Sequence, residues 1–360
     1  MTYAIFSIVA EEVSPSGCSS FTYQIYSEQP YTRAPWFQFS EQLTDNFVTN
    51  GGTHPAYPFL TGHGGANQVT IFGYLGYRLI PDGLLHLDPS MPPQIPYLRF
   101  RTFYWQGWPI SAQSNHTHTT LTRLDTPHVG ANSTLANSNI PIILGNNNNK
   151  TYELKPNDTI VFPNRQIGLI KTVPRNIAQC LPVTSPDEYL PGQFPLSAVD
   201  GAASTKWQPT RSNISQSITV ALSTIAPISN LYFDWAQNPP VNFTVQFHNS
   251  SAVNPNDLAA ASVSNVQISV PYNATQVNLI TPYMANTTNV TLNPPVYSGY
   301  YATLTIEGNQ ANPFNNGTGA SVAEWAIVAA GGQQMGMKLM PRMSSIDLGR
   351  YNAYAEGRRH

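Results

Sequence analysis

The hydrophobic pattern of this chain changes from a helical period to a strand period near residue 84. Before that point, apolar residues at helical spacing predict a helix from Asn67 through Tyr77 that ends at Pro81-Asp82-Gly83. After that point, short runs of apolar and β-branched residues between polar loops predict strands. The candidate strands are 97–105, 151–154, 159–162, 217–222, 228–235, 241–247, 263–270, 300–307 and 324–329.

This change of period predicts a multidomain chain. Residues 1–83 are expected to be helices joined by Pro/Gly loops, and about 80 such residues cannot easily enclose a core alone. Residues 84–172 are expected to form a small β-domain. The spacing of the strands in 176–335 is typical of an antiparallel β-sandwich. The Met-rich and then basic tail, 336–360, is expected to be flexible.

Composition excludes two classes of protein. Charged residues make up 10% of the 360 residues, and the net charge is -2. Such a chain lacks the basic surface that nucleic-acid binding requires, so no nucleic-acid partner is expected. No apolar run reaches the roughly 18 residues of a membrane span.

Eleven Asn-x-Ser/Thr sequons lie between residues 115 and 316, and none precedes them. Glycans need an exposed surface in the secretory pathway, so this density predicts a secreted glycoprotein. The alternative is that Asn-rich loops produce sequons by accident. The candidate sites are Asn115, Asn132, Asn149, Asn157, Asn213, Asn242, Asn249, Asn273, Asn286, Asn289 and Asn316.

The first twelve residues are typical of an amphipathic helix rather than a signal peptide, because they have no basic start and no cleavage site. We therefore expect the natural N-terminus to lie upstream. Glu11 and Glu12 are expected on the solvated face of this helix. Two cysteines, Cys18 and Cys180, are too few for a disulfide framework. They could pair with each other or with cysteines outside this sequence.

The run Asn50–Asn67 combines five glycines, two prolines and two histidines. It predicts either a tight connector between helices or a loop that approaches a ligand closely. Upstream, Glu41 lies beside the aromatic segment Pro35–Phe39. Aromatic rings around one carboxylate are typical of a sugar site, since rings stack on sugars and raise the pKa of nearby acids. The alternative is an exposed helix glutamate.

Other chemistries are not indicated by this region. The spacing of His54, His63 and Glu41 matches no zinc motif, and no metal site is predicted. No nucleophile elbow is present. The cluster Gly62–Gly65 is not followed by the Lys-Ser/Thr of a phosphate-binding loop, so no cofactor is predicted.

Four segments carry a family resemblance: Trp36–Gln42, Asn50–Ala56, Phe59–Asn67 and Tyr74–Leu79. Together they closely resemble fungal acid trehalases of glycoside hydrolase family 65. The resemblance implies that residues 1–83 are the α-helical end of an (α/α)6 barrel and that a small β-domain follows. It implies hydrolysis of trehalose by an inverting mechanism, in which one carboxyl protonates the glycosidic oxygen and another activates water.

The same resemblance implies roles for particular residues. It makes Glu41 the general base and leaves the general acid upstream of Met1, so the isolated chain is expected to be inactive. Proposed substrate contacts are the side chains and main chain at Trp36, Thr61, His63, Gly64 and Gly65. Tyr57 is a further stacking candidate, and His54 either contacts the sugar or braces the loop.

A second resemblance is carried by Ala198–Pro209, which looks like the Asp-Gly-x-x-x-Thr-x-Trp segment of discoidin-type (coagulation factor 5/8 C) sandwiches. In this segment we expect Asp200 and Trp207 to brace a turn and a core. Such modules often bind glycans, so cell-wall glycans are a second candidate partner beside trehalose. The alternative function is a non-catalytic secreted carbohydrate-binding β-sandwich with a remnant helical cap. The expected location is secreted, at the cell wall or periplasm, or vacuolar.

Overall fold

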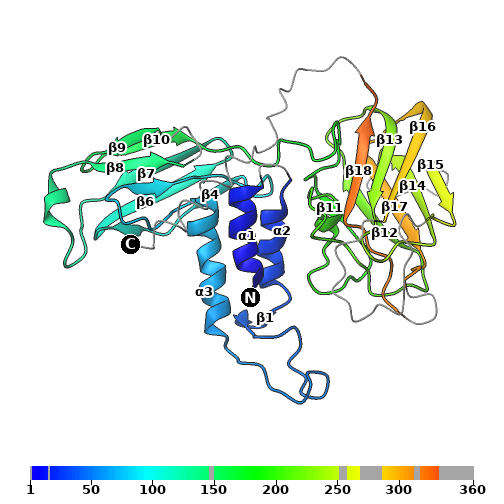
Figure 1. Cartoon of the computed structure of the whole chain (residues 1–360), viewed down its shortest axis with the longest axis horizontal. Coiled ribbons are helices and arrows are strands. Elements are labelled where there is room, and N and C mark those ends of the chain that lie inside the picture. The colour runs from blue at the N-terminus through cyan, green and yellow to red at the C-terminus, as the bar shows by residue number, and fades with distance from the viewer. Residues whose placement is uncertain are drawn as a thin grey trace, which may run out of the picture. The chain divides into compact units, whose positions relative to one another are not determined.

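The computed structural model describes residues 2–14, 17–145, 150–250, 258–267, 286–311 and 317–331. Within these residues the chain is mostly β-sheet with a few short helices near its N-terminus (Figure 1). The predicted tail, 336–360, lies outside the described residues. No helix in the described part is long and apolar enough to cross a membrane.

Three helices and a small hairpin make up the N-terminal segment. Helices α1 (Thr2–Val13), α2 (Ser19–Glu28) and α3 (Leu60–Gln68) lie side by side, and a π-helix, η1 (Val69–Tyr74), continues α3 (Figure 1). Strands β1 (Thr32–Arg33) and β2 (Gln38–Phe39) pair antiparallel, with Thr32 opposite Phe39. The two helices before residue 30 agree with the predicted helical segment.

The start of α3 corrects the sequence prediction. A helix was expected from Asn67, but it begins at Leu60, so the glycines at 62, 64 and 65 are helical. Each glycine lowers helix stability by about 1 kcal/mol relative to alanine. Close packing favours the helix nonetheless: a Cβ on Gly62 would lie 2.9 Å from a ring carbon of Phe39, and one on Gly65 would lie 3.3 Å from Cβ of Ala4.

Two small sheets follow the helices. One has the order β10-β7-β6-β4, with β5 also on β6, and the other has the order β3-β8-β9, in which β3 and β8 are parallel. The strands are β3 (Leu85–Leu87), β4 (Tyr97–Arg99), β5 (Phe103–Trp105), β6 (Trp108–Asn115), β7 (His118–Arg123), β8 (Ile140–Leu144), β9 (Thr151–Leu154) and β10 (Thr159–Pro163). A 3-10 turn, η2, spans Ser133–Ala136.

These sheets share one hydrophobic core with the helices. Ala4, Val69 and Tyr74 from the helical segment are buried in the same cluster as Leu85 and Phe162 from the strands. The expected boundary at residue 83 therefore does not separate two cores. We call this cluster the shared core.

Arg165 adds polar contacts where the helices meet these strands. Its Nη2 donates to the main-chain oxygen of Glu11 (2.7 Å), and its Nε donates to Oδ2 of Asp88 (3.1 Å). Glu11 is 1% exposed and accepts a hydrogen bond from Oγ of Ser90 (2.8 Å). The expectation that Glu11 faces solvent is therefore wrong, because the β-region covers that side of α1; Glu12 remains exposed.

The remaining strands form two antiparallel sheets around a second core (Figure 1). The sheet orders are β11-β12-β17-β14-β15 and β16-β13-β18. A short 3-10 turn, η3 (Pro195–Ala198), precedes β12. The strands are β11 (Val183–Thr184), β12 (Gln216–Ala221), β13 (Pro227–Asp234), β14 (Asn242–His248), β15 (Ala259–Ser264), β16 (Thr287–Tyr297), β17 (Tyr301–Glu307) and β18 (Glu324–Ala329).

Large aromatic side chains fill this second core. Phe233 of β13 and Trp235, which directly follows that strand, stack with ring centroids 4.7 Å apart, and Trp325 of β18 is also fully buried. Trp207 is 0% exposed and exchanges two main-chain hydrogen bonds with Val322 (2.9 Å each). The expected bracing role of Trp207 is therefore confirmed.

Asp200 also braces its turn as expected. Its Oδ1 accepts from the N–H of Ala202 (2.9 Å), and its Oδ2 accepts from Oγ1 of Thr205 (2.7 Å).

One strand prediction is wrong in this region: the run 263–270 was expected to be a strand, whereas β15 ends at Ser264. Residues 268–270 lie outside the described residues.

Candidate functional site

Glu41 lies two residues after the end of β2 and is fixed by the segment that leads into α3. Its N–H donates to the carbonyl oxygen of Ala56 (3.1 Å), and its Oε2 accepts from the N–H of Ala56 (3.0 Å). The N–H of Phe59 donates to the carbonyl oxygen of Phe39 (2.7 Å). Residues 56–59 therefore run beside β2, and Glu41 is held at two points rather than placed on a helix.

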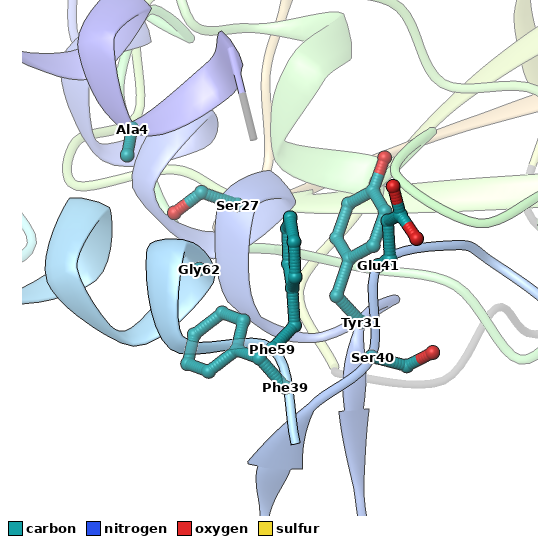
Figure 2. Close-up of a pocket in the computed structure, with 8 residues that line it drawn as sticks. All are labelled: Ala4, Ser27, Tyr31, Phe39, Ser40, Glu41, Phe59 and Gly62. Atoms are coloured by element: carbon teal, nitrogen blue, oxygen red, sulfur yellow. The ribbon is translucent and has the colours of Figure 1, made fainter. Parts of the chain in front are cut away.

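A shallow hollow opens beside Glu41 (Figure 2). Figure 2 shows the rings of Tyr31, Phe39 and Phe59 and the carboxylate of Glu41 around it. Ala4, Ser27, Ser40 and Gly62 complete the lining. Glu41 is the one carboxylate among these eight lining residues, all of which belong to the described part of the chain.

The Glu41 side chain is exposed, and only Oε2 has a hydrogen-bond partner among the described residues. Oε1 is therefore available to accept a proton or to bind a hydroxyl group. A carboxylate that keeps one free oxygen at an open hollow can act as a general base toward water.

Arg33 clamps the segment that follows Glu41. Its Nη2 donates to the carbonyl oxygen of Gln42 (2.8 Å), and its Nε lies 2.6 Å from Oδ2 of Asp45. Oγ of Ser40 donates to Oδ1 of Asp45 (2.6 Å). The hydrogen bond from the Arg33 guanidinium lowers the pKa of the Asp45 carboxyl, with Ser40 contributing in the same direction. Arg33 and the Asp45 carboxylate thus hold the 40–45 loop, since Ser40 at one end bonds to Asp45 at the other and Arg33 bonds to Asp45 and Gln42.

His63 supports this arrangement from α3. Its Nε2 accepts from the N–H of Phe39 (3.3 Å), and its ring meets the ring of Phe39 edge-on at 4.9 Å. His63 therefore joins α3 to β2 and does not line the hollow.

The other predicted contacts also lie outside the lining. Trp36 is 79% exposed in the turn between β1 and β2, and Thr61 is exposed at the start of α3. Gly64 and Gly65 lie in α3 beyond its first turn, where main-chain N–H groups bond within the helix. Their amides are therefore not donors for a sugar, although a Cβ on Gly64 would meet nothing within 4 Å.

Two further aromatic predictions fall in the 50–58 loop. The ring of His54 lies 4.9 Å from the ring of Phe47, so it braces the loop. Tyr57 is 48% exposed. Sequence reasoning missed Tyr31, Ser40 and Phe59 as lining residues. No local sequence signal marks them, because the hairpin register that sets Thr32 opposite Phe39 brings the chain before β1 beside the chain after β2.

The predicted glycosylation sites differ in exposure. Asn242 is partly exposed. Asn286 is 3% exposed, and its Nδ2 donates to the carbonyl oxygen of Ala236 (2.8 Å), so this packing does not accommodate a glycan on that nitrogen. Asn149, Asn273 and Asn316 lie outside the described residues. The exposed candidates are Asn115, Asn132, Asn157, Asn213, Asn249 and Asn289.

No group of three or more His, Cys, Asp or Glu side chains in the described ranges is arranged to hold a metal ion.

The chain can be compared with solved structures. It matches chitosan-binding module 1 of a chitosanase/glucanase from Paenibacillus sp. IK-5, with a TM-score of 0.34 and 16% identity over 42% of this chain and 97% of that chain. A likeness at this level carries no functional information for this chain.

Sequence relatives are closer. Residues 78–129 match the family model of the glycosyl hydrolase family 65 C-terminal domain. The chain is 54% identical over 358 residues to a cell wall acid trehalase of Arthroderma benhamiae, a match that covers 91% of this chain and 34% of that protein. It is 51% identical over 350 residues to an acid trehalase of Emericella nidulans, covering 91% of this chain and 33% of that protein.

The chain therefore spans about a third of the length of these curated relatives. Together with the match at residues 78–129, the two alignments make it a homologue of the fungal acid trehalases that contains a glycosyl hydrolase family 65 C-terminal domain.

Proposed function

We propose that this chain is the C-terminal portion of an acid α,α-trehalase, which hydrolyses trehalose to two glucose molecules. The observation that carries the proposal is its sequence identity to fungal acid trehalases over 91% of its length. Because the chain spans about a third of those proteins, the activity belongs to a longer polypeptide. In that polypeptide, residues 1–83 are the end of an (α/α)6 barrel.

The exposed side of α1 supports the barrel. Ile5, Phe6, Val9 and Val13 are between 44% and 54% exposed on this one helix. A row of exposed apolar side chains marks a surface that another element covers. In the complete barrel, helices outside this sequence pack on that row.

Glu41 is the general base in this proposal. Its Oε2 is oriented by the N–H of Ala56, which leaves Oε1 to take a proton from the attacking water. An inverting hydrolase also needs a carboxylic acid that protonates the glycosidic oxygen, roughly 6.5–9.5 Å from the base. The hollow itself provides one carboxylate, so the acid comes from the longer polypeptide and the isolated chain is inactive.

Five further residues have proposed roles around the substrate. Trp36 is exposed in the turn between β1 and β2, and Thr61 is exposed at the start of α3. Both contact the sugar when the barrel is complete. His63 acts through Phe39, whose N–H it holds. Gly64 contributes a helix surface without a side chain, which leaves room for the substrate, and Gly65 supports it by packing α3 against Ala4 of α1.

The test of this assignment is Glu41→Gln in the full-length enzyme. Glutamine can still accept the hydrogen bond from the N–H of Ala56, so the loop keeps its conformation. It cannot take a proton, so kcat for trehalose should fall by a factor of about 10² to 10⁴, which is the usual contribution of a general base. The measurement is glucose release at saturating trehalose, with KM determined in the same series.

Glu12→Gln is the matched control, because Glu12 is an exposed glutamate that only pairs with Arg78 (2.8 Å). Its kcat should stay within about twofold of the parent, since exposed ion pairs contribute little. Near-normal turnover by Glu41→Gln would exclude Glu41 as the base. Release of glucose by the purified 360-residue chain would contradict the proposed location of the acid.

We also propose that the protein is secreted and resides at the cell wall, in the periplasm or in the vacuole. The relatives' names include cell wall, periplasmic and secreted acid trehalases. The six exposed sequons support the same location, because an N-glycan requires passage through the secretory pathway. Enzymatic removal of N-glycans should lower the mass of the natural protein, and an unchanged mass would contradict the proposal.

A further inference from the structure

We infer that Cys18 and Cys180 form a disulfide bond in the secreted protein. The two residues are the chain's only cysteines, and they lie 162 positions apart in the sequence (180 − 18). Both are buried, with Cys18 1% exposed and Cys180 8% exposed. The inference rests on the proposed secretion, because disulfides persist in oxidising compartments.

The main chain brings the two cysteines to one place. Cys18 stands directly before α2, and its N–H donates to the carbonyl oxygen of Asp200 (2.7 Å). The N–H of Cys180 donates to the carbonyl oxygen of Val199 (2.7 Å). Since Val199 and Asp200 are consecutive, their Cα atoms are about 3.8 Å apart, and both cysteines are anchored to one short stretch of chain.

Side-chain contacts place the sulfur atoms together. Nε2 of Gln94 donates to Sγ of Cys18 (3.2 Å) and to the carbonyl oxygen of Cys180 (3.3 Å). The Cys18 and Cys180 side chains are themselves in hydrogen-bonding contact. One nitrogen atom is thus within 3.3 Å of an atom of each cysteine, and no element separates the two thiols.

The main chain turns tightly where the two cysteines meet. The φ of Cys180 is +66°, in the left-handed region that residues with a side chain seldom occupy. The neighbouring Gly17 and Gly201 also have positive φ, at +74° and +79°. A Cβ on Gly17 would lie 2.3 Å from the oxygen of Asp200, so the backbones here are in direct contact.

The bond must form before this region closes. The thiolate is the reacting form of cysteine, and burial raises the pKa of the Cys18 thiol well above its usual value. Oxidation therefore occurs while the chain is still folding. A disulfide-bearing oxidant, such as the oxidised form of a thiol–disulfide oxidoreductase or oxidised glutathione, accepts the two electrons. Each cysteine loses one proton, one S–S bond forms in the chain, and one S–S bond of the oxidant is cleaved to two thiols.

The test is peptide mapping of the full-length natural protein, alkylated under denaturing conditions without reductant and digested with trypsin. Cys18 falls in the peptide that ends at Arg33, and Cys180 falls in peptide 176–206, and neither stretch contains a sequon. The expected product is the two peptides joined, 2 Da lighter than their sum. Recovery of either cysteine in alkylated form, or bonded to a different cysteine, would overturn the inference.

Glycopeptides in the same digest test the proposed secretion independently of the disulfide bond. A glycosylated chain with two alkylated cysteines contradicts the disulfide alone. A chain without glycans contradicts secretion, and refolding in a glutathione redox buffer then decides the pairing independently: a joined peptide supports it and two free thiols refute it.

Stability gives a second readout. The double variant Cys18→Ser/Cys180→Ser should lose roughly 5 to 10 °C in Tm relative to the oxidised parent, because the bond closes a long loop. In the presence of dithiothreitol, the Tm of the parent should fall to that of the double variant. The Tm of the double variant itself should be the same with and without dithiothreitol. An equal response of parent and double variant to the reductant would contradict the bond.

Discussion

Arg165 offers a quantitative test of how the helices are joined to the first β-region. Its guanidinium contacts the main chain of Glu11, the carboxylate of Asp88 and Oγ of Ser90 (3.3 Å). The Arg165 and Asp88 side chains are each 16% exposed. We expect Arg165→Met to remove the cation shared by the buried Glu11 and the partly buried Asp88 while preserving most of the packing volume.

The expected loss depends on pH. Removal of one partner of a buried pair costs about 3–5 kcal/mol, and partial exposure favours the lower limit, about 3 kcal/mol at pH 7. Burial raises the pKa of Glu11 and of Asp88 above their ordinary values, and Arg165 opposes that rise at both groups. Without Arg165 both folded-state pKa values rise further.

A carboxyl whose folded-state pKa is raised stabilises the fold fully below its unfolded pKa and loses that contribution as the pH rises. In acid, Glu11 and Asp88 are protonated with or without the arginine. Arg165→Met then loses only ordinary hydrogen bonds, worth about 1 kcal/mol. The difference in free energy of unfolding between parent and variant should therefore grow by about 2 kcal/mol from pH 4 to pH 7.

Thermal unfolding at several pH values measures this difference. At roughly 2–4 °C per kcal/mol, the variant's Tm should lie about 6 °C or more below the parent at pH 7 and about 2–4 °C below it at pH 4. Arg165→Lys is the control, since it keeps the charge but not the planar set of donors, and its loss should vary less with pH. A Tm loss for Arg165→Met that is the same at both pH values would refute this reasoning.

Two further predictions concern α3 and the loop after β2. Gly62→Ala should lower the free energy of unfolding by about 1–3 kcal/mol, because its Cβ would meet the ring of Phe39 at 2.9 Å, whereas Gly64→Ala should raise it by up to about 1 kcal/mol. Chemical denaturation compares the two variants, and equal effects would contradict the packing argument. Arg33→Lys in the full-length enzyme should lower kcat about tenfold or more by loosening the loop that carries Glu41, with little change in Tm. Unchanged trehalose turnover would show that the Arg33 contacts do not position Glu41.

Local patterns predicted some strands well and missed others, among them β6, β7 and β8. The runs 151–154 and 324–329 coincide with β9 and β18. They are short, rich in apolar or β-branched residues and bounded by turns, so local sequence specifies them. The long strand β16 was missed because its polar and Pro-containing sequence shows no such pattern. Its place depends on pairing with β13, which lies far away in the chain.

The candidate site was likewise predicted only in part from the sequence. Glu41 was chosen from its neighbours and from family resemblance, and it does lie at a hollow. The lining as a whole was not predictable, since Tyr31 and Phe59 reach it through the β1–β2 pairing and the bond from Phe59 to Phe39. The glycine run was expected to be a loop because propensity alone disfavours a helix there. Contacts made by residues 62 and 65 with Phe39 and Ala4 reverse that preference.

The shared core has a consequence for synthesis on the ribosome. Tyr74 and Leu75 of the helical segment are buried together with Phe162, which is translated much later. At about 5–20 residues per second, the interval from Leu75 to Phe162 lasts on the order of 4 to 17 seconds. During that interval the strands that complete the shared core are added one after another, so part of the apolar side of the helices stays uncovered. Folding factors in the secretory pathway must protect it, and a truncation after residue 83 would make that exposure permanent.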